Sequence, residues 1–260
     1  MSPGPRPLSV LLSIFRSLIT VRKPGPFGNS TTDHSALDEP LQNLAHNGAS
    51  TLSEIDGPLQ SYLDAMAALD PNSLTRSEAL AYWINVYNGG ALLLAGEAQR
   101  NREDSILGVF GGFQRKFFTV AGENLSLDDI EHAKLRRFGD PRIHAALVCG
   151  SVSCPTLRSE PYSGENLDAQ LDDQVRHFLT AGGCRPDIGK SVVHLSRVFL
   201  WFGADFVRPH RMPTLWPVRS SQTLAALKRW MDPDTASWIE SVNPDVEFQR
   251  YDWGLRCTVR

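Results

Sequence analysis

Residues 140–155 read DPRIHAALVCGSVSCP, and this stretch decides how we interpret the rest of the chain. It opens with an Asp-Pro pair, which breaks regular structure, and then runs through mostly apolar residues over a length suited to a buried strand. The run stops at Gly150, and Cys154 and Pro155 follow. The pattern predicts a core strand that ends in two thiols, so we expect any chemistry to be gathered here.

The composition is that of an ordinary soluble globular protein. The chain has 260 residues, of which 42% are hydrophobic and 21% are charged, enough for one large domain with a sizeable core. The formal net charge of −3, with basic residues scattered along the chain, argues against a nucleic-acid partner. We expect a small molecule or a peptide as the partner, and no cofactor.

Four cysteines do not make a disulfide scaffold in a chain of this length, and no CxxC pair suggests a zinc ribbon. Reduced thiols are therefore expected at Cys149, Cys154, Cys184 and Cys257. A disulfide bond between Cys149 and Cys154 remains an alternative if the turn between them folds back far enough. A metal site of these two thiols and one or two histidines also stays open, but its CxxxxC spacing is looser than usual, and we assign no metal ligand.

The first part of the chain differs from the rest, and we divide the sequence into an arm and linker over residues 1–50 and a single globular domain over 51–260. Residues 8–19 are apolar, but Arg16 interrupts them, and a transmembrane helix takes about 20 apolar residues. We therefore predict no transmembrane span here, but an amphipathic helix or an unfolded arm with at most weak membrane contact. The expected location is cytoplasmic, and a signal peptide of a secreted protein is the alternative.

A long helix over residues 76–98 is the best marked element. Thr75 followed by Glu78 is typical of a capping box. Asn85 and Asn88 lie three residues apart on one edge of this helix, where their amides must find partners if they are buried. The pair Gly89-Gly90 in mid-helix costs about 1 kcal/mol per glycine, so we expect another group to approach closely there.

The other elements mix helices and strands without a regular βαβ order. Helices are expected over residues 57–69, after Ser126, after Ser163 and from Thr223 onwards, a hairpin around Gly122, and strands over 191–195 and 246–253. The predicted class is therefore α+β, with a mixed or antiparallel central sheet packed against the long central helix and surrounding helices. No GxGxxG, GxxxxGK[ST] or GxSxG motif is present.

Five motifs together resemble the domain of unknown function family numbered 547. They are YWINVYN at 82–88, SLDDIEH at 126–132, DPRIHAALVC at 140–149, SCPTL at 153–157 and YDW at 251–253. The likeness covers roughly residues 55–255, and it departs from the family pattern at Gly89-Gly90. The resemblance implies no activity, but it marks motif positions: Trp83, Asn85, Tyr87, Asn88, Glu131, His132, Arg142, His144, Cys149, Cys154 and Pro155.

These motifs supply the candidate site residues. We assign candidate catalytic roles to Cys149, Cys154, His144, His132, Glu131 and Asn85, and candidate ligand-binding roles to Asn88, Arg142 and Tyr87. In an extended strand His144 and Cys149 would lie about 16 Å apart on opposite faces, so they would not form a dyad. Cys154 is able to return toward His144, and either thiol is able to meet His132.

Two functions follow from these candidates. The first is a module that binds a small ligand or a partner through its polar pocket, because satisfied buried polar networks and inert buried cysteines are common in proteins. The alternative is a cysteine-dependent hydrolase or acyl-transfer enzyme of the papain or transglutaminase type, with Glu131 or Asn85 orienting the imidazole. Such enzymes place the cysteine at the start of the central helix, whereas this helix starts at Thr75.

Overall fold

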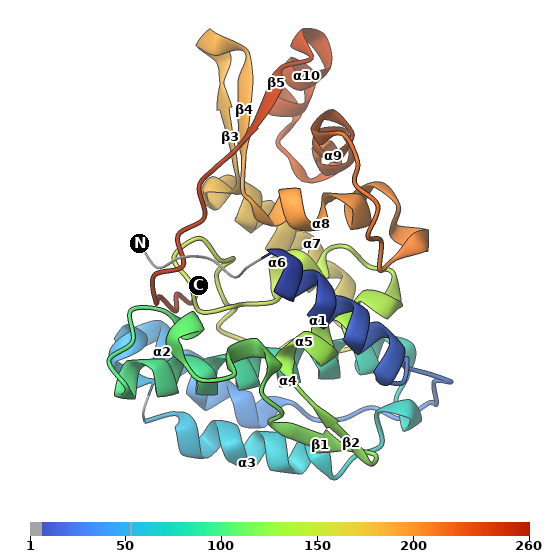
Figure 1. Ribbon diagram of the computed structural model, residues 1–260, viewed down its shortest axis with the longest axis vertical. Coiled ribbons are helices and arrows are strands. Elements are labelled where there is room, and N and C mark those ends of the chain that lie inside the picture. Colours follow the sequence, from blue (N-terminus) through green and yellow to red (C-terminus); the bar gives the residue numbers. More distant parts are fainter. Residues whose placement is uncertain (1–6, 53) are drawn as a thin grey trace. The chain divides into compact units, whose positions relative to one another are not determined.

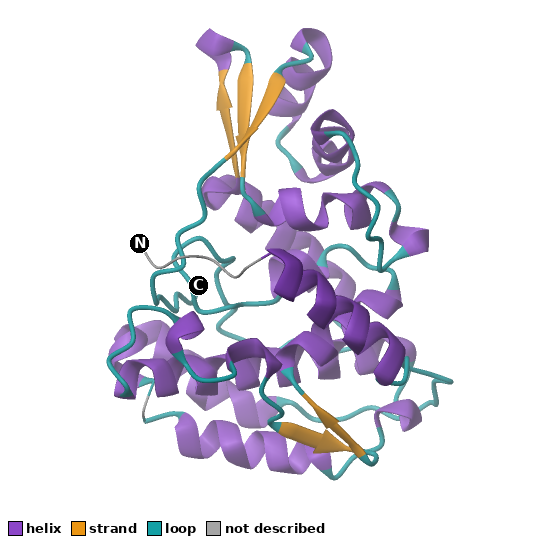
Figure 2. Ribbon diagram, in the orientation of Figure 1, coloured by secondary structure: helices purple, strands orange, loops and turns teal. Residues whose placement is uncertain are grey.

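The computed structural model describes residues 7–52 and 54–260 (Figures 1 and 2). Helices dominate, and two small sheets accompany them, which confirms the α+β class. The chain forms two compact units. The first unit comprises the described residues up to 138 together with 147–168 and 252–260, and the second comprises 139–146 and 169–251. The division into an arm over 1–50 and one domain over 51–260 stays a prediction.

The first unit is built around helix α4, Arg76–Arg100, which is buried along most of its length. The Thr75 hydroxyl accepts the Glu78 N–H at 3.3 Å, so the predicted cap is present. A Cβ at Gly90 would lie 2.4 Å from the ring of Phe117, which explains why glycine stands there. The other helices and strands of this unit are α1 (Pro7–Thr20), α2 (Asp38–Asn47), α3 (Asp56–Ala67), β1 (Phe118–Val120), β2 (Glu123–Leu125) and α5 (Leu127–Asp129).

The segment after β2 is helical in three successive forms. Ser126 caps α5 in a capping box with Asp129, as the sequence indicates. The chain then continues as a π turn, η6 (Ile130–Lys134), and a short 3₁₀ helix, η7 (Leu135–Phe138). π turns of this kind are frequent at functional sites, and this one carries Glu131 and His132.

Helix α1 packs on α5 and η6. The Ser17 hydroxyl donates to the carboxylate of Asp129 at 2.8 Å, and the Ser13 hydroxyl donates to Asp128. The sequence left a helix or an unfolded arm open for residues 8–19, and the structure has a helix there. Among the described residues no helix combines the length and the apolar character needed to cross a membrane.

The predicted strand over residues 140–149 is wrong. Ile143–Ala146 forms a short helix, α6, and the residues after it have no regular structure. The Asp140 carboxylate accepts the Arg142 N–H at 3.0 Å, and the Ala145 N–H donates to the Arg142 carbonyl at 3.0 Å. The Asp-Pro pair therefore starts a helical turn, with Asp as the cap and Pro in the first turn.

The second unit holds the larger of the two sheets. Its order is β3-β4-β5, with β3 antiparallel and β5 parallel to β4. Strands predicted over 191–195 and from residue 246 are confirmed as β4 and β5, but Tyr251–Trp253 is not a strand. The remaining elements include α7 (Leu167–Phe178), β3 (Cys184–Asp187), β4 (Val192–Leu195), α8 (Val198–Val207), α9 (Ser220–Leu227), α10 (Pro233–Val242) and β5 (Asp245–Phe248).

Candidate functional site

The cysteine segment, residues 147–155, lies in the first unit and is fixed by its own backbone and by helix α4. The side-chain oxygen of Asn88 accepts the Val148 N–H at 3.0 Å. Gly150 adopts a left-handed conformation with φ 67°, so the chain turns back on itself after Cys149. The Cys149 N–H then donates to the sulfur of Cys154 at 2.8 Å. The two thiols therefore share one small turn, and both cysteines are half-buried.

The last residues of the chain hold the outer side of this turn. The Arg256 N–H donates to the Gly150 carbonyl, and the Val152 N–H donates to the Gly254 carbonyl, both at 2.9 Å. Further along, the Leu157 N–H donates to the Thr258 carbonyl at 2.8 Å. Backbone pairing over residues 252–260 thus gives the cysteine segment a rigid support.

A half-buried acid, Glu131, and a buried phenol, Tyr87, lie near the thiols. The Tyr87 hydroxyl is 3.4 Å from the Glu131 carboxylate, and Nδ1 of His132 is 4.0 Å from the other carboxylate oxygen. Burial, followed by the charges of Asp128 and Cys149, raises the pKa of Glu131 to about 8. We call Tyr87, Glu131, His132, Cys149 and Cys154 the polar cluster.

Electrostatics in the polar cluster favour the neutral forms of its acids. Burial raises the pKa of Tyr87 well above its ordinary value, and the neighbouring charges of Glu131 and both cysteines add to this effect. Burial also raises the pKa of the nearby Cys257 to about 12, with a further contribution from Cys149. Cys257 is therefore an inert thiol at neutral pH, because the thiolate is the reactive form.

The space beside the cysteine segment is small. A cavity of about 10 Å³ is bordered by Val148, Gly150, Cys154, Pro155 and Cys257, among others. This is about the volume that one water molecule requires. It offers no preformed room for a drug-sized ligand, which would need several hundred Å³.

Asn85 has a structural task one turn earlier on α4. Its NH₂ group donates to the Tyr162 carbonyl at 2.8 Å, and its oxygen accepts the Tyr162 N–H at 3.0 Å. These two hydrogen bonds tie the loop at Tyr162 to the helix. The buried amide of Asn85 therefore has the partners that the sequence analysis expected it to need. The catalytic role for Asn85 and the ligand-binding role for Asn88 stay predictions.

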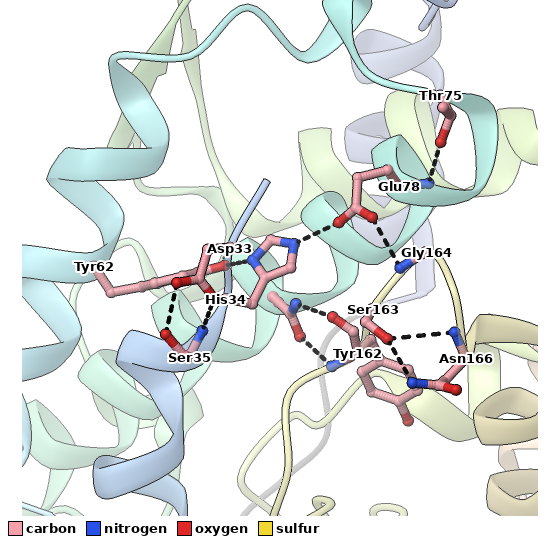
Figure 3. A network of polar contacts seen from close by, with 11 residues as sticks. Asp33, His34, Ser35, Tyr62, Thr75, Glu78, Tyr162, Ser163, Gly164 and Asn166 are labelled. Carbon is pink, nitrogen blue, oxygen red and sulfur yellow. Dashed lines mark hydrogen bonds and ion pairs between the residues drawn. The ribbon is translucent and has the colours of Figure 1, made fainter. Parts of the chain in front are cut away.

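A second buried network was missed by the sequence analysis (Figure 3). His34 lies between Tyr62 and Glu78, with its Nδ1 2.8 Å from the tyrosine hydroxyl and its Nε2 3.1 Å from the carboxylate. The other Glu78 oxygen accepts the Gly164 N–H at 3.1 Å. Burial lowers the pKa of His34 to about 4 and raises that of Glu78. His34 stands in the segment interpreted as a linker, where a single histidine gives no signal.

Two candidate residues belong to the second unit. His144 is buried, its Nε2 is 2.9 Å from the Asp205 carboxylate, and its ring stacks on Phe202. Arg142 forms ion pairs with Asp140 at 2.7 Å and with Asp172 at 2.9 Å. These contacts give both residues partners within their own unit, and their predicted roles at a site stay predictions.

No metal centre is evident in the part of the chain that the structure describes, where no three His, Cys, Asp or Glu side chains are grouped so as to hold an ion. All four cysteines lie in that part, and none forms a disulfide bond.

Comparison with known protein families gives a match to part of the chain. The family described as "Protein of unknown function, DUF547" matches residues 71–179, which confirms the resemblance drawn from the motifs. The match includes four of the five motifs and ends before Tyr251, so the likeness is shown over a shorter range than expected. The comparisons found no similar curated protein and no similar solved structure. Residues 71–179 are therefore similar to this family, whose description assigns no activity.

Proposed function

We propose that the polar cluster is a thiol site for acyl groups, in which Cys149 attacks a carbonyl carbon and Glu131 transfers the proton. The observation that supports this proposal is the carboxyl of Glu131, whose pKa is raised to about 8 by burial, with smaller contributions from the charges of Asp128 and Cys149. Strongly perturbed acids of this kind are concentrated at functional sites. A carboxyl that titrates near neutral pH is suited both to accept and to return a proton.

The proposed reaction has two steps. Ionised Glu131 takes the thiol proton of Cys149, a carbon–sulfur bond forms, and the alcohol or amine of the substrate leaves with that proton. Water then attacks the acyl-thioester while Glu131 accepts its proton, the carbon–sulfur bond breaks, and Glu131 returns the proton to the thiolate as the acid product leaves. An amine or alcohol in place of water gives acyl transfer.

The surroundings of Cys149 support this role by holding the thiol still. Asn88 fixes the preceding residue, and the turn at Gly150 is paired with Arg256. The Ser151 hydroxyl lies 3.0 Å from the Cys149 sulfur. Catalytic groups need positions held by such supporting contacts, because small displacements cost large factors in rate.

The test combines thiol labelling with turnover. We expect iodoacetamide, followed by mass spectrometry of the folded protein, to modify Cys149 faster than Cys184, whose pKa burial raises to about 11. The labelling rate should change with pH around 8, and Glu131→Gln should remove that change. On a p-nitrophenyl ester, Cys149→Ser should abolish the acyl-enzyme, and Glu131→Gln should slow turnover about a hundredfold or more.

Cys184→Ser is the matched control, and it should leave labelling of Cys149 and turnover unchanged. Thermal melting of each variant separates loss of fold from loss of chemistry. Equal, slow labelling of Cys149 and Cys184 in the folded protein would overturn the proposal, and so would ester hydrolysis that survives Cys149→Ser.

The second candidate is a non-catalytic module, in which these polar groups form a satisfied internal network that supports the binding of a partner. The observation that favours it is that Asn85 and Asn88 both satisfy backbone groups, which is how a buried polar network fixes a unique core. Under this function Cys149→Ser should alter stability without altering hydrolysis of any generic ester.

A further inference from the structure

The outer face of helix α1 is an apolar stripe that no other described residue covers. Its five large side chains are between 54% and 70% exposed, and they are Leu8, Leu11, Leu12, Phe15 and Ile19. At about 100° per residue these positions fall within one narrow arc of the helix. Isolated apolar residues on a surface are ordinary, but a continuous stripe of this kind indicates an interaction site.

The opposite face of α1 is the one that packs on the first unit. Ile14 and Ser17 are buried, and Ser13 and Ser17 donate hydrogen bonds to Asp128 and Asp129. The hydroxyl groups therefore point inward to carboxylates, while the largest apolar groups point outward. An ordinary surface helix turns most of its apolar side chains to the core, whereas α1 buries Ile14 and leaves five large ones exposed.

The charges around the stripe are cationic. Helix α1 contains no acidic residue, and Arg16 lies on it at the edge of the stripe. Lys23 follows shortly after the helix and is exposed, like Arg16, and neither of the two forms an ion pair with any described residue. The neighbouring acids are already engaged, since Asp129 pairs with Lys116 and Glu123 pairs with Lys134.

We propose that α1 attaches the protein to an anionic lipid surface, with the apolar stripe lying in the plane of the membrane interface. Helices that bind in this way combine a strong apolar face with cations beside it, and their affinity rises with anionic lipid. A helix of 14 residues is about 21 Å long, so it suits the interface rather than a crossing. The proposal does not depend on the thiol chemistry of the polar cluster.

The experiment is co-sedimentation of the full chain with vesicles. We expect binding to vesicles of phosphatidylcholine mixed with phosphatidylglycerol, much weaker binding to phosphatidylcholine alone, and further weakening at high salt. The double variant Leu12→Gln, Phe15→Gln should bind about tenfold or more weakly, because two large side chains no longer enter the acyl region. Glutamine is a good helix former, so α1 should remain folded.

Ile188→Gln is the matched control, because Ile188 is 69% exposed and lies in the second unit. It should bind the anionic vesicles as the unchanged protein does. Arg16→Glu with Lys23→Glu should remove the preference for anionic lipid. Circular dichroism and thermal melting establish that each variant is folded.

Three outcomes would overturn the proposal. The unchanged protein does not bind anionic vesicles, the control variant loses as much binding as the double variant, or the stripe holds two copies together. In the last case light scattering would show a dimer without lipid, and Leu12→Gln, Phe15→Gln would convert it to a monomer while vesicle binding stayed the same.

Discussion

We predict that His34 makes the protein less stable as the pH falls from about 6.5 to about 4. The neutral ring is held between Tyr62 and Glu78, and burial lowers its pKa from 6.5 to about 4. Between these two pH values His34 binds a proton in the unfolded chain but not in the folded protein. The free energy of unfolding therefore decreases as the pH falls. Above the unfolded pKa the contribution of His34 is complete, and below the folded pKa no more is lost.

The size of the effect follows from the difference between the two pKa values. Each pKa unit corresponds to about 1.4 kcal/mol, so the loss should be about 3 kcal/mol. Glu78 acts with the opposite sign, because burial raises its pKa and its contribution is lost as the pH rises. A comparison of variants that all retain Glu78 therefore isolates most of the effect of His34.

The assay is urea unfolding of the protein and of His34→Gln over the same pH interval. Glutamine is always neutral and keeps polar groups for Tyr62 and Glu78, so the variant should lose about 3 kcal/mol less than the unchanged protein. His210→Gln, at an exposed position, should follow the unchanged protein. Parallel loss of stability in the protein and in His34→Gln would refute the reasoning, and so would a His34 ring that titrates at 6.5 in an NMR experiment.

Three further predictions concern helix α4 and are read by urea or thermal unfolding. Gly90→Ala should destabilise the protein by about 1–3 kcal/mol, because the new methyl group would lie 2.4 Å from the Phe117 ring. Gly89→Ala should stabilise it by up to about 1 kcal/mol, because its nearest contact is at an ordinary 3.5 Å; a loss like that of Gly90→Ala would contradict the packing described. Asn85→Asp should cost about 2–4 kcal/mol, because it sets an oxygen against the Tyr162 carbonyl, and a neutral result would show that this pairing contributes little.

Local signals in the sequence predicted much of the fold. The caps at Thr75 and Ser126 and the close approach at Gly90 all occur as expected, because each depends on neighbouring residues or on backbone sterics. The prediction of a strand over 140–149 was wrong because the local signal there is ambiguous. A short apolar run fits a strand and a buried helical turn equally well, and the hydrogen bond from Arg142 to the Asp140 side chain decided between them.

The candidate site was predictable only in part. The motifs pointed to Glu131 and the two cysteines, which the polar cluster contains. His34 was missed because its partners lie 28 and 44 residues away, and distant pairs of that kind leave no periodic pattern. The support that residues 252–260 give to the cysteine segment was also not predictable from the sequence. It consists of backbone hydrogen bonds, which depend little on the identity of the side chains.

The pairing of the last residues with the cysteine segment sets an order of events during synthesis. Val152 has its backbone partner at Gly254, about 100 residues later in the chain. A ribosome adds about 5–20 residues per second, so the turn that bears the two thiols waits about 5–20 s for that partner. Until then, the segment that carries Cys149 and Cys154 lacks the backbone support of residues 252–260.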